Sequence, residues 1–77
     1  MTRPTRAEML ELAADRDRCA GRSERNARSG EAAATDPANS PAVQKMAATA
    51  AHFARNHARE YREEAAALRD GRLPGED

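Results

Sequence analysis

The stretch PAVQKMAATAAHFARNHAREYREEAAALRD, residues 41–70, decides the fold, because nothing after its first residue breaks a helix. Ser40 can cap the first turn, and Pro41 stands at the first helical position, where its missing N–H costs nothing. Gly71 follows the stretch directly and is a natural helix terminator. These signals predict one long helix over residues 41–70.

Most apolar side chains of this helix fall on one side of it. At about 100° per residue, the shared stripe consists of Val43, Met46, Ala47, Ala50, Ala54, His57, Tyr61, Ala65 and Leu68, with Phe53 at its edge. We therefore expect this stripe to be the packed face of the helix.

A second helix is predicted over residues 5–28, earlier in the chain. Thr5 and Glu8 have the spacing of a capping box, in which each side chain satisfies the other's backbone N–H. Its apolar stripe contains Met9, Leu12, Ala13, Arg16, Ala20 and Ala27. The segment SGEAAATDPANS, residues 29–40, is rich in turn-forming residues and predicts a loop, and residues 71–77 are expected to form a mobile tail.

Charge favours an antiparallel hairpin. That arrangement brings Ala13 roughly opposite His57 and Ala20 opposite Ala50. It also places the acidic start of the first helix beside arginines of the second, in a set comprising Glu8, Glu11, Asp15, Arg59, Arg62 and Arg69. Each exposed ion pair contributes only about 0.2 to 1 kcal/mol, so the charges select the orientation more than they stabilise it. Alanine methyl groups on both stripes predict a close approach of the helix axes.

The composition points to a small domain with a weak core. Nineteen of the thirty hydrophobic residues among the 77 are alanine. Alanine favours helix but buries only a methyl group. We therefore expect residues 1–77 to form a single all-α domain, a two-helix antiparallel hairpin completed into a bundle by self-association or by a larger protein partner.

Charge and cysteine content exclude several classes. Thirteen basic and thirteen acidic residues balance, so no global field attracts nucleic acid or anionic lipid. Cys19 has no second cysteine to pair with, which fits a reducing compartment. No apolar run is long enough for a signal peptide or a membrane span. We expect a cytoplasmic protein that does not bind membranes.

No catalytic or cofactor motif is present, so we expect neither an enzyme nor a bound cofactor. His57, Glu60 and Glu64 can converge on one helix face, and a metal or small-ligand site at a subunit interface is therefore one alternative. In this chain His57 precedes Glu60, which is the reverse of the Glu-x-x-His order found in di-iron bundles. His57 and Tyr61 can also form a polar cluster with Arg16 and Asp17 across the hairpin.

A stripe of arginines on the first helix provides a second alternative function. Arg18, Arg22, Arg25 and Arg28 can contact phosphates, as in a helical hairpin that binds nucleic acid. Against this, the chain has no aromatic platform on which bases could stack.

Protein interaction is the function that the sequence favours. It predicts a small non-enzymatic assembly, adaptor or regulatory subunit that acts through its alanine-rich helical face. The predicted interface residues are Met9, Leu10, Leu12, Phe53, His57 and Tyr61, because large side chains carry most of the contact energy. If Phe53 is buried, its truncation to alanine should cost about 3 kcal/mol or more.

Overall fold

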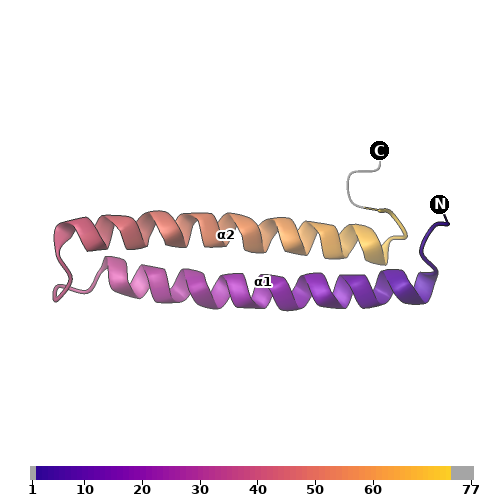
Figure 1. Cartoon of the computed structure of the whole chain (residues 1–77), viewed down its shortest axis with the longest axis horizontal. Helices are drawn as coiled ribbons and strands as arrows, with labels where there is room; N and C mark the ends of the chain where they lie inside the picture. Colours follow the sequence, from indigo (N-terminus) through magenta and orange to yellow (C-terminus); the bar gives the residue numbers. More distant parts are fainter. Residues whose placement is uncertain (1, 74–77) are drawn as a thin grey trace.

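The computed structural model describes residues 2–73 and contains two α-helices that run antiparallel, side by side (Figure 1). Helix α1 spans Arg6–Ala34 and helix α2 spans Pro41–Arg69, so each contains 29 residues. The part of the chain that the structure describes contains no strand. The start of α1 and the end of α2 lie together at what we call the open end, and the connection forms the loop end. The predicted all-α hairpin is confirmed.

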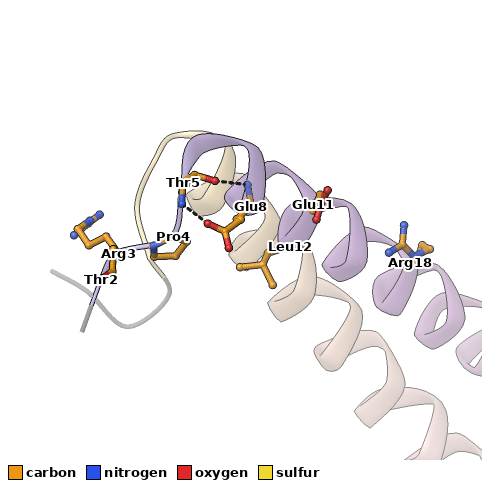
Figure 2. A pocket seen from close by; sticks show the side chains of 8 residues that line it. All are labelled: Thr2, Arg3, Pro4, Thr5, Glu8, Glu11, Leu12 and Arg18. Carbon is orange, nitrogen blue, oxygen red and sulfur yellow. Dashed lines mark hydrogen bonds between the residues drawn. The ribbon is translucent and has the colours of Figure 1, made fainter.

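The predicted capping box begins α1. The Glu8 backbone N–H donates to the Thr5 hydroxyl over 3.1 Å, and the Thr5 N–H donates to the Glu8 carboxylate over 2.8 Å (Figure 2). These hydrogen bonds, the one from the Thr5 backbone above all, hold the pKa of Glu8 below its ordinary value. The helix therefore starts where the sequence predicts.

The predicted end of this helix at residue 28 is wrong, because α1 continues to Ala34. Gly30, expected in a loop, lies inside the helix and against α2. A Cβ atom on Gly30 would stand only 3.0 Å from the Ala47 carbonyl oxygen and 3.0 Å from Ala51 Cβ. A helical glycine costs about 1 kcal/mol relative to alanine, and the close packing of α2 at this point explains why one is used here.

A short loop over residues 35–40 replaces the predicted loop over 29–40. Asp36 organises it, because its carboxylate accepts from the Ala38 N–H over 2.9 Å and its carbonyl from Gln44 Nε2 over 2.7 Å. Asn39 Nδ2 donates to the Ala33 carbonyl over 3.0 Å. The Ser40 hydroxyl then caps α2 by accepting from the Val43 N–H over 3.3 Å, as predicted.

Gly71 ends α2, as predicted, with a φ of 81° that favours glycine. The Gly71 N–H donates to the Leu68 carbonyl over 3.1 Å, and the Arg72 N–H donates to the Ala67 carbonyl over 2.8 Å. This pair of bonds is a Schellman motif. It turns the chain so that Leu73 packs on the core. Of the predicted mobile tail 71–77, residues 71–73 therefore continue the fold, and 74–77 lie outside the described residues.

The two helices meet along a seam of alanine. Each contributes three buried alanines spaced seven residues apart, which are Ala13, Ala20 and Ala27 from α1 and Ala51, Ala58 and Ala65 from α2. A seven-residue repeat corresponds to 3.5 residues per turn, the spacing of a coiled coil. Because only methyl groups separate the helices along most of the seam, we call this surface the alanine seam.

Larger core residues are confined to the open end. Met9 and Leu68 form a buried cluster there with Ala13 and Ala65, and Leu73 packs against it. Ala13 is thus grouped with residues about two helical turns beyond His57, its predicted counterpart. The predicted register was wrong because α1 is longer and the loop shorter than expected.

The predicted stripe of α2 only partly matches its packed face. Ala65 and Leu68 are buried as expected, but Ala51 and Ala58 are buried in place of Ala50 and His57, which are exposed. A period of 3.6 residues drifts by about 20° per heptad from the 3.5-residue repeat that the packing follows. Large side chains such as Met46 also drew the predicted stripe away from the alanines.

Candidate interaction surface

Beside the alanine seam, one edge of the hairpin is closed by a ladder of ion pairs. Asp17, Glu24 and Glu31 of α1 are spaced by seven residues, as are their partners Arg55, Arg62 and Arg69 of α2. We call these six residues the ion-pair ladder. The seven-residue spacing follows the seam, so each step of the ladder lies at the same edge.

Several ion pairs of this ladder have short nitrogen–oxygen distances. Arg55 Nη2 lies 2.7 Å from Glu31 Oε1, and Arg55 Nε also donates to that carboxylate over 3.2 Å. Arg62 bridges two acids, with 3.0 Å to Asp17 and 2.7 Å to Glu24. Arg69 donates to the other oxygen of Asp17. Arginine thus uses its forked geometry at two of the three positions.

The arginines of the ladder lower the pKa values of Asp17 and Glu31. The hydrogen bond from Arg69 is the main reason that the pKa of Asp17 lies below its ordinary value, and partial desolvation opposes it. The hydrogen bond from Arg55 likewise lowers the pKa of Glu31. The predicted antiparallel charge match is thus present, but the partners predicted for Arg62 and Arg69 were wrong. Glu8, Glu11 and Asp15 were expected there, and Asp17 and Glu24 take those places because of the shifted register.

The predicted polar cluster around His57 is not assembled. Arg16 Nε lies 2.9 Å from Glu64 Oε2, and Arg16 also pairs with Asp15. Asp17 belongs to the ladder instead. His57 is exposed, and Tyr61 is half-buried on the packed side of α2.

The residues of the metal alternative are likewise engaged elsewhere or apart. Glu64 faces Arg16, and within residues 2–73 no three His, Cys, Asp or Glu side chains gather as metal ligands would. Nothing in the arrangement therefore supports a site at His57, Glu60 and Glu64 in this chain by itself.

An apolar surface on the outward side of α2, near the loop end, is the most conspicuous feature outside the core. It is a shallow hollow lined by Ala42, Lys45, Met46, Thr49, Ala50 and Phe53, which we call the α2 patch. Met46 is 72% exposed and Phe53 is 56% exposed, and Val43 lies exposed next to them. The largest apolar side chains of this half of the molecule thus contribute little to its fold.

The predicted interface residues are distributed over the whole molecule. Phe53 belongs to the α2 patch, and Leu10 and Leu12 are exposed near the open end, where Leu12 borders a second hollow (Figure 2). Met9 is buried between the helices, where a partner cannot reach it. Met46 and Val43 were missed as surface residues, because both were assigned to the packed stripe. The seven-residue spacing of Ala51, Ala58 and Ala65 was the signal that could have revealed them.

The outward face of α1 carries the arginines singled out in the sequence. Arg18, Arg22 and Arg25 surround Gly21 in a shallow hollow that also includes Asp17. Arg22 Nη2 donates to Cys19 Sγ over 3.2 Å, and Cys19 is half-buried. Arg28 is exposed further along the helix. We call Arg18, Arg22, Arg25 and Arg28 the arginine stripe.

Comparison with known proteins adds no assignment. No protein-family model matches the chain, and no match was found among curated proteins or solved structures. Within the described residues, neither helix is long and apolar enough to cross a membrane. The function must therefore be argued from the α2 patch and the arginine stripe.

Proposed function

We propose that this chain is a small non-enzymatic assembly subunit that pairs with a second copy of itself through the α2 patch. The observation that carries the proposal is the exposure of Met46 and Phe53 on a helix whose other side is already packed. Burying such a side chain contributes about 1.5 to 3 kcal/mol. Large side chains of this kind supply most of the energy in protein interfaces.

Self-pairing is favoured because the α2 patch is complementary to itself. Met46 and Phe53 are seven residues, or about two turns, apart on one side of α2. In an antiparallel pair of α2 helices related by a two-fold axis, Met46 of each copy lies opposite Phe53 of the other. Such an isologous contact uses the same surface twice, and a thioether against an aromatic ring is a favourable pair.

The residues between these two anchors fit a close contact. Thr49 and Ala50 would lie near the two-fold axis, where small side chains allow the helices to approach. Lys45 is the one charged residue of the α2 patch, and the whole chain carries no net charge. Neither the local nor the overall charge therefore opposes association of two copies.

Light scattering behind a sizing column, over a concentration series up to several hundred micromolar, tests the proposal. We expect the wild type to form a dimer and the double variant Met46→Glu/Phe53→Glu to be monomeric, because each carboxylate would be desolvated in the contact. Ala66→Glu controls for adding a carboxylate elsewhere on α2, because Ala66 is exposed outside the patch. Circular dichroism should show that all three proteins keep their helices.

Two outcomes would overturn the proposal. One is a wild type that stays monomeric throughout the concentration series, which would leave the patch to a different partner or to none. The other is a dimer that survives the double substitution, which would place the contact elsewhere, for example at Leu10 and Leu12.

A further inference from the structure

We propose that the arginine stripe of α1 binds the phosphate backbone of nucleic acid without reading its sequence. The inference is independent of the proposed pairing, because it concerns the other helix and a different kind of contact. It rests on how differently the two helices use their arginines.

The arginines of the ladder are neutralised, whereas those of the stripe are largely not. Arg55, Arg62 and Arg69 each bond at least one carboxylate of α1. In the stripe, Arg18 approaches Asp15 at 3.6 Å while its side chain stays 65% exposed, and the partner of Arg22 is a thiol. Because the ladder arginines are paired and those of the stripe largely are not, the outward face of α1 around Arg22 holds a local excess of positive charge.

The last two arginines of the stripe have still less compensation. Among the described residues, no carboxylate lies within 4.0 Å of Arg25 or Arg28. Arg28 feels the charge of Glu31, but Glu31 is already bonded to Arg55. The stripe therefore ends in two exposed arginines that no carboxylate of the described residues pairs with.

The spacing along α1 suits a row of phosphates. Arg18, Arg22 and Arg25 stand at i, i+4 and i+7 and so share one face of the helix. From Arg18 to Arg25 the helix rises by about 10 Å, so these three guanidinium groups form a row that can contact about three phosphates of a duplex.

Gly21 makes the centre of this face accessible. Where a side chain would stand at Gly21, the nearest atom is Arg25 Nη1, at 3.5 Å from the ideal Cβ position. A phosphate group can thus approach the helix surface between three guanidinium groups. Arginine is well suited to this role, because its fork binds two phosphate oxygens at once.

Other polyanions and surfaces fit less well. A membrane-binding helix needs bulky apolar residues beside its basic ones, and the hollow in the stripe contains none, since it is lined by Asp17, Arg18, Gly21, Arg22 and Arg25. An aromatic platform for stacking bases is also lacking there. Backbone contact alone accounts for the arrangement, and it predicts binding that is indifferent to base sequence.

Fluorescence polarisation with a labelled 20-base-pair duplex of arbitrary sequence tests this inference. About three phosphate contacts predict an affinity that falls by roughly 40-fold between 50 and 200 mM salt. A second duplex of unrelated sequence should bind equally well. The triple variant Arg18→Gln/Arg22→Gln/Arg25→Gln should lose most of the binding and most of its salt dependence.

A control of equal charge separates the stripe from the charge of the whole chain. The control variant is Arg6→Gln/Arg59→Gln/Arg72→Gln, which removes three exposed arginines outside the stripe and the ladder. It loses the same net charge as the stripe variant, and its affinity for the duplex should stay within about twofold of wild type. Equal loss in the two triple variants would overturn the inference, as would the absence of binding at 25 mM salt. Binding to anionic phosphatidylserine vesicles but not to the duplex would also overturn it.

The two proposals fail separately. Met46→Glu/Phe53→Glu leaves the stripe intact, so its binding to the duplex at concentrations where wild type is monomeric should equal that of wild type. A wild type that binds the duplex but never dimerises would therefore sink only the first proposal, and a wild type that dimerises but never binds the duplex would sink only the second.

Discussion

The two sides of α2 reverse the usual relation between side-chain size and burial. Toward α1, the helix presents Ala51, Ala58 and Ala65, each at most 4% exposed, while Met46 and Phe53 stand outside at 72% and 56%. The inward residues are small because the helices approach closely, and a larger side chain would separate them. Bulk is therefore excluded from the seam and is placed where a second molecule can use it.

The strongest test of this contrast compares a large buried residue with a large exposed one. Leu68→Ala should lower the free energy of unfolding by about 2 to 5 kcal/mol, because Leu68 is 2% exposed in the core of the open end. Phe53→Ala should change it by no more than about 0.5 kcal/mol when the protein is monomeric. Urea denaturation at low micromolar concentration measures both. A large loss for Phe53→Ala under these conditions would place Phe53 in the core after all.

Enlarging an alanine should destabilise the hairpin on the buried side of α2 and should have little effect on its exposed side. Ala58→Leu adds three carbons to the seam and should destabilise the hairpin by about 1 to 3 kcal/mol. Ala66→Leu makes the same change on an exposed position of α2 and should stay within about 0.5 kcal/mol of wild type. Thermal unfolding followed by circular dichroism distinguishes them. Equal Tm values for the two variants would mean that the seam is loosely packed.

Two glycines of α1 provide a finer comparison. Gly21→Ala should stabilise the helix by about 0.5 to 1 kcal/mol, because the new methyl group would meet only the flexible end of Arg25. Gly30→Ala should be destabilising despite the same gain in helix propensity. Its methyl group would stand 3.0 Å from the Ala47 carbonyl and from Ala51 Cβ, neither of which can swing away. Two shifts of Tm in the same direction would contradict the close approach at the loop end.

The smallest expected effect is the pH dependence of the ion-pair ladder. The pKa values of Asp17 and Glu31 are lowered in the folded chain, so their contribution is present above their unfolded pKa values and is lost as pH falls through the folded ones. The Tm should therefore decline below about pH 4.5, and less steeply in 1 M salt or in Asp17→Asn. Glu60→Gln serves as the control, since Glu60 is exposed and outside the ladder. If Asp17→Asn leaves the decline of Tm unchanged, other carboxyl groups cause that decline.

Features of the fold that depend on neighbouring residues in the chain were predictable. The caps at Thr5 and Ser40, the start at Pro41 and the stop at Gly71 follow from local hydrogen bonding and backbone preference. The end of α1 was not predictable. Gly30 is suited to its place in the helix because of its contact with Ala51, which is distant in sequence. Local turn propensity alone therefore placed the loop too early.

The surfaces were predictable only in part, for a related reason. The arginine stripe follows from spacing on one helix, so the sequence located it. The α2 patch depends on which face of the helix α1 covers, and large residues such as Met46 were assumed to be covered. The seven-residue spacing shared by the seam and the ladder was visible in the sequence. A period of 3.5 residues per turn, in place of 3.6, would have assigned Met46 to the exposed face.

The alanine seam also bears on how this hairpin finds its alignment. Alanines that recur every seven residues are interchangeable, and Asp17, Glu24, Glu31 and their arginines recur with the same period. A slip of one heptad would therefore preserve many contacts of both kinds. What opposes it is the pair of non-repeating ends: a slip would separate Met9 from Leu68 at the open end, and at the loop end it would break the hydrogen bonds of Asp36 and Asn39. The ends of the hairpin thus supply the specificity of alignment that its repetitive middle cannot.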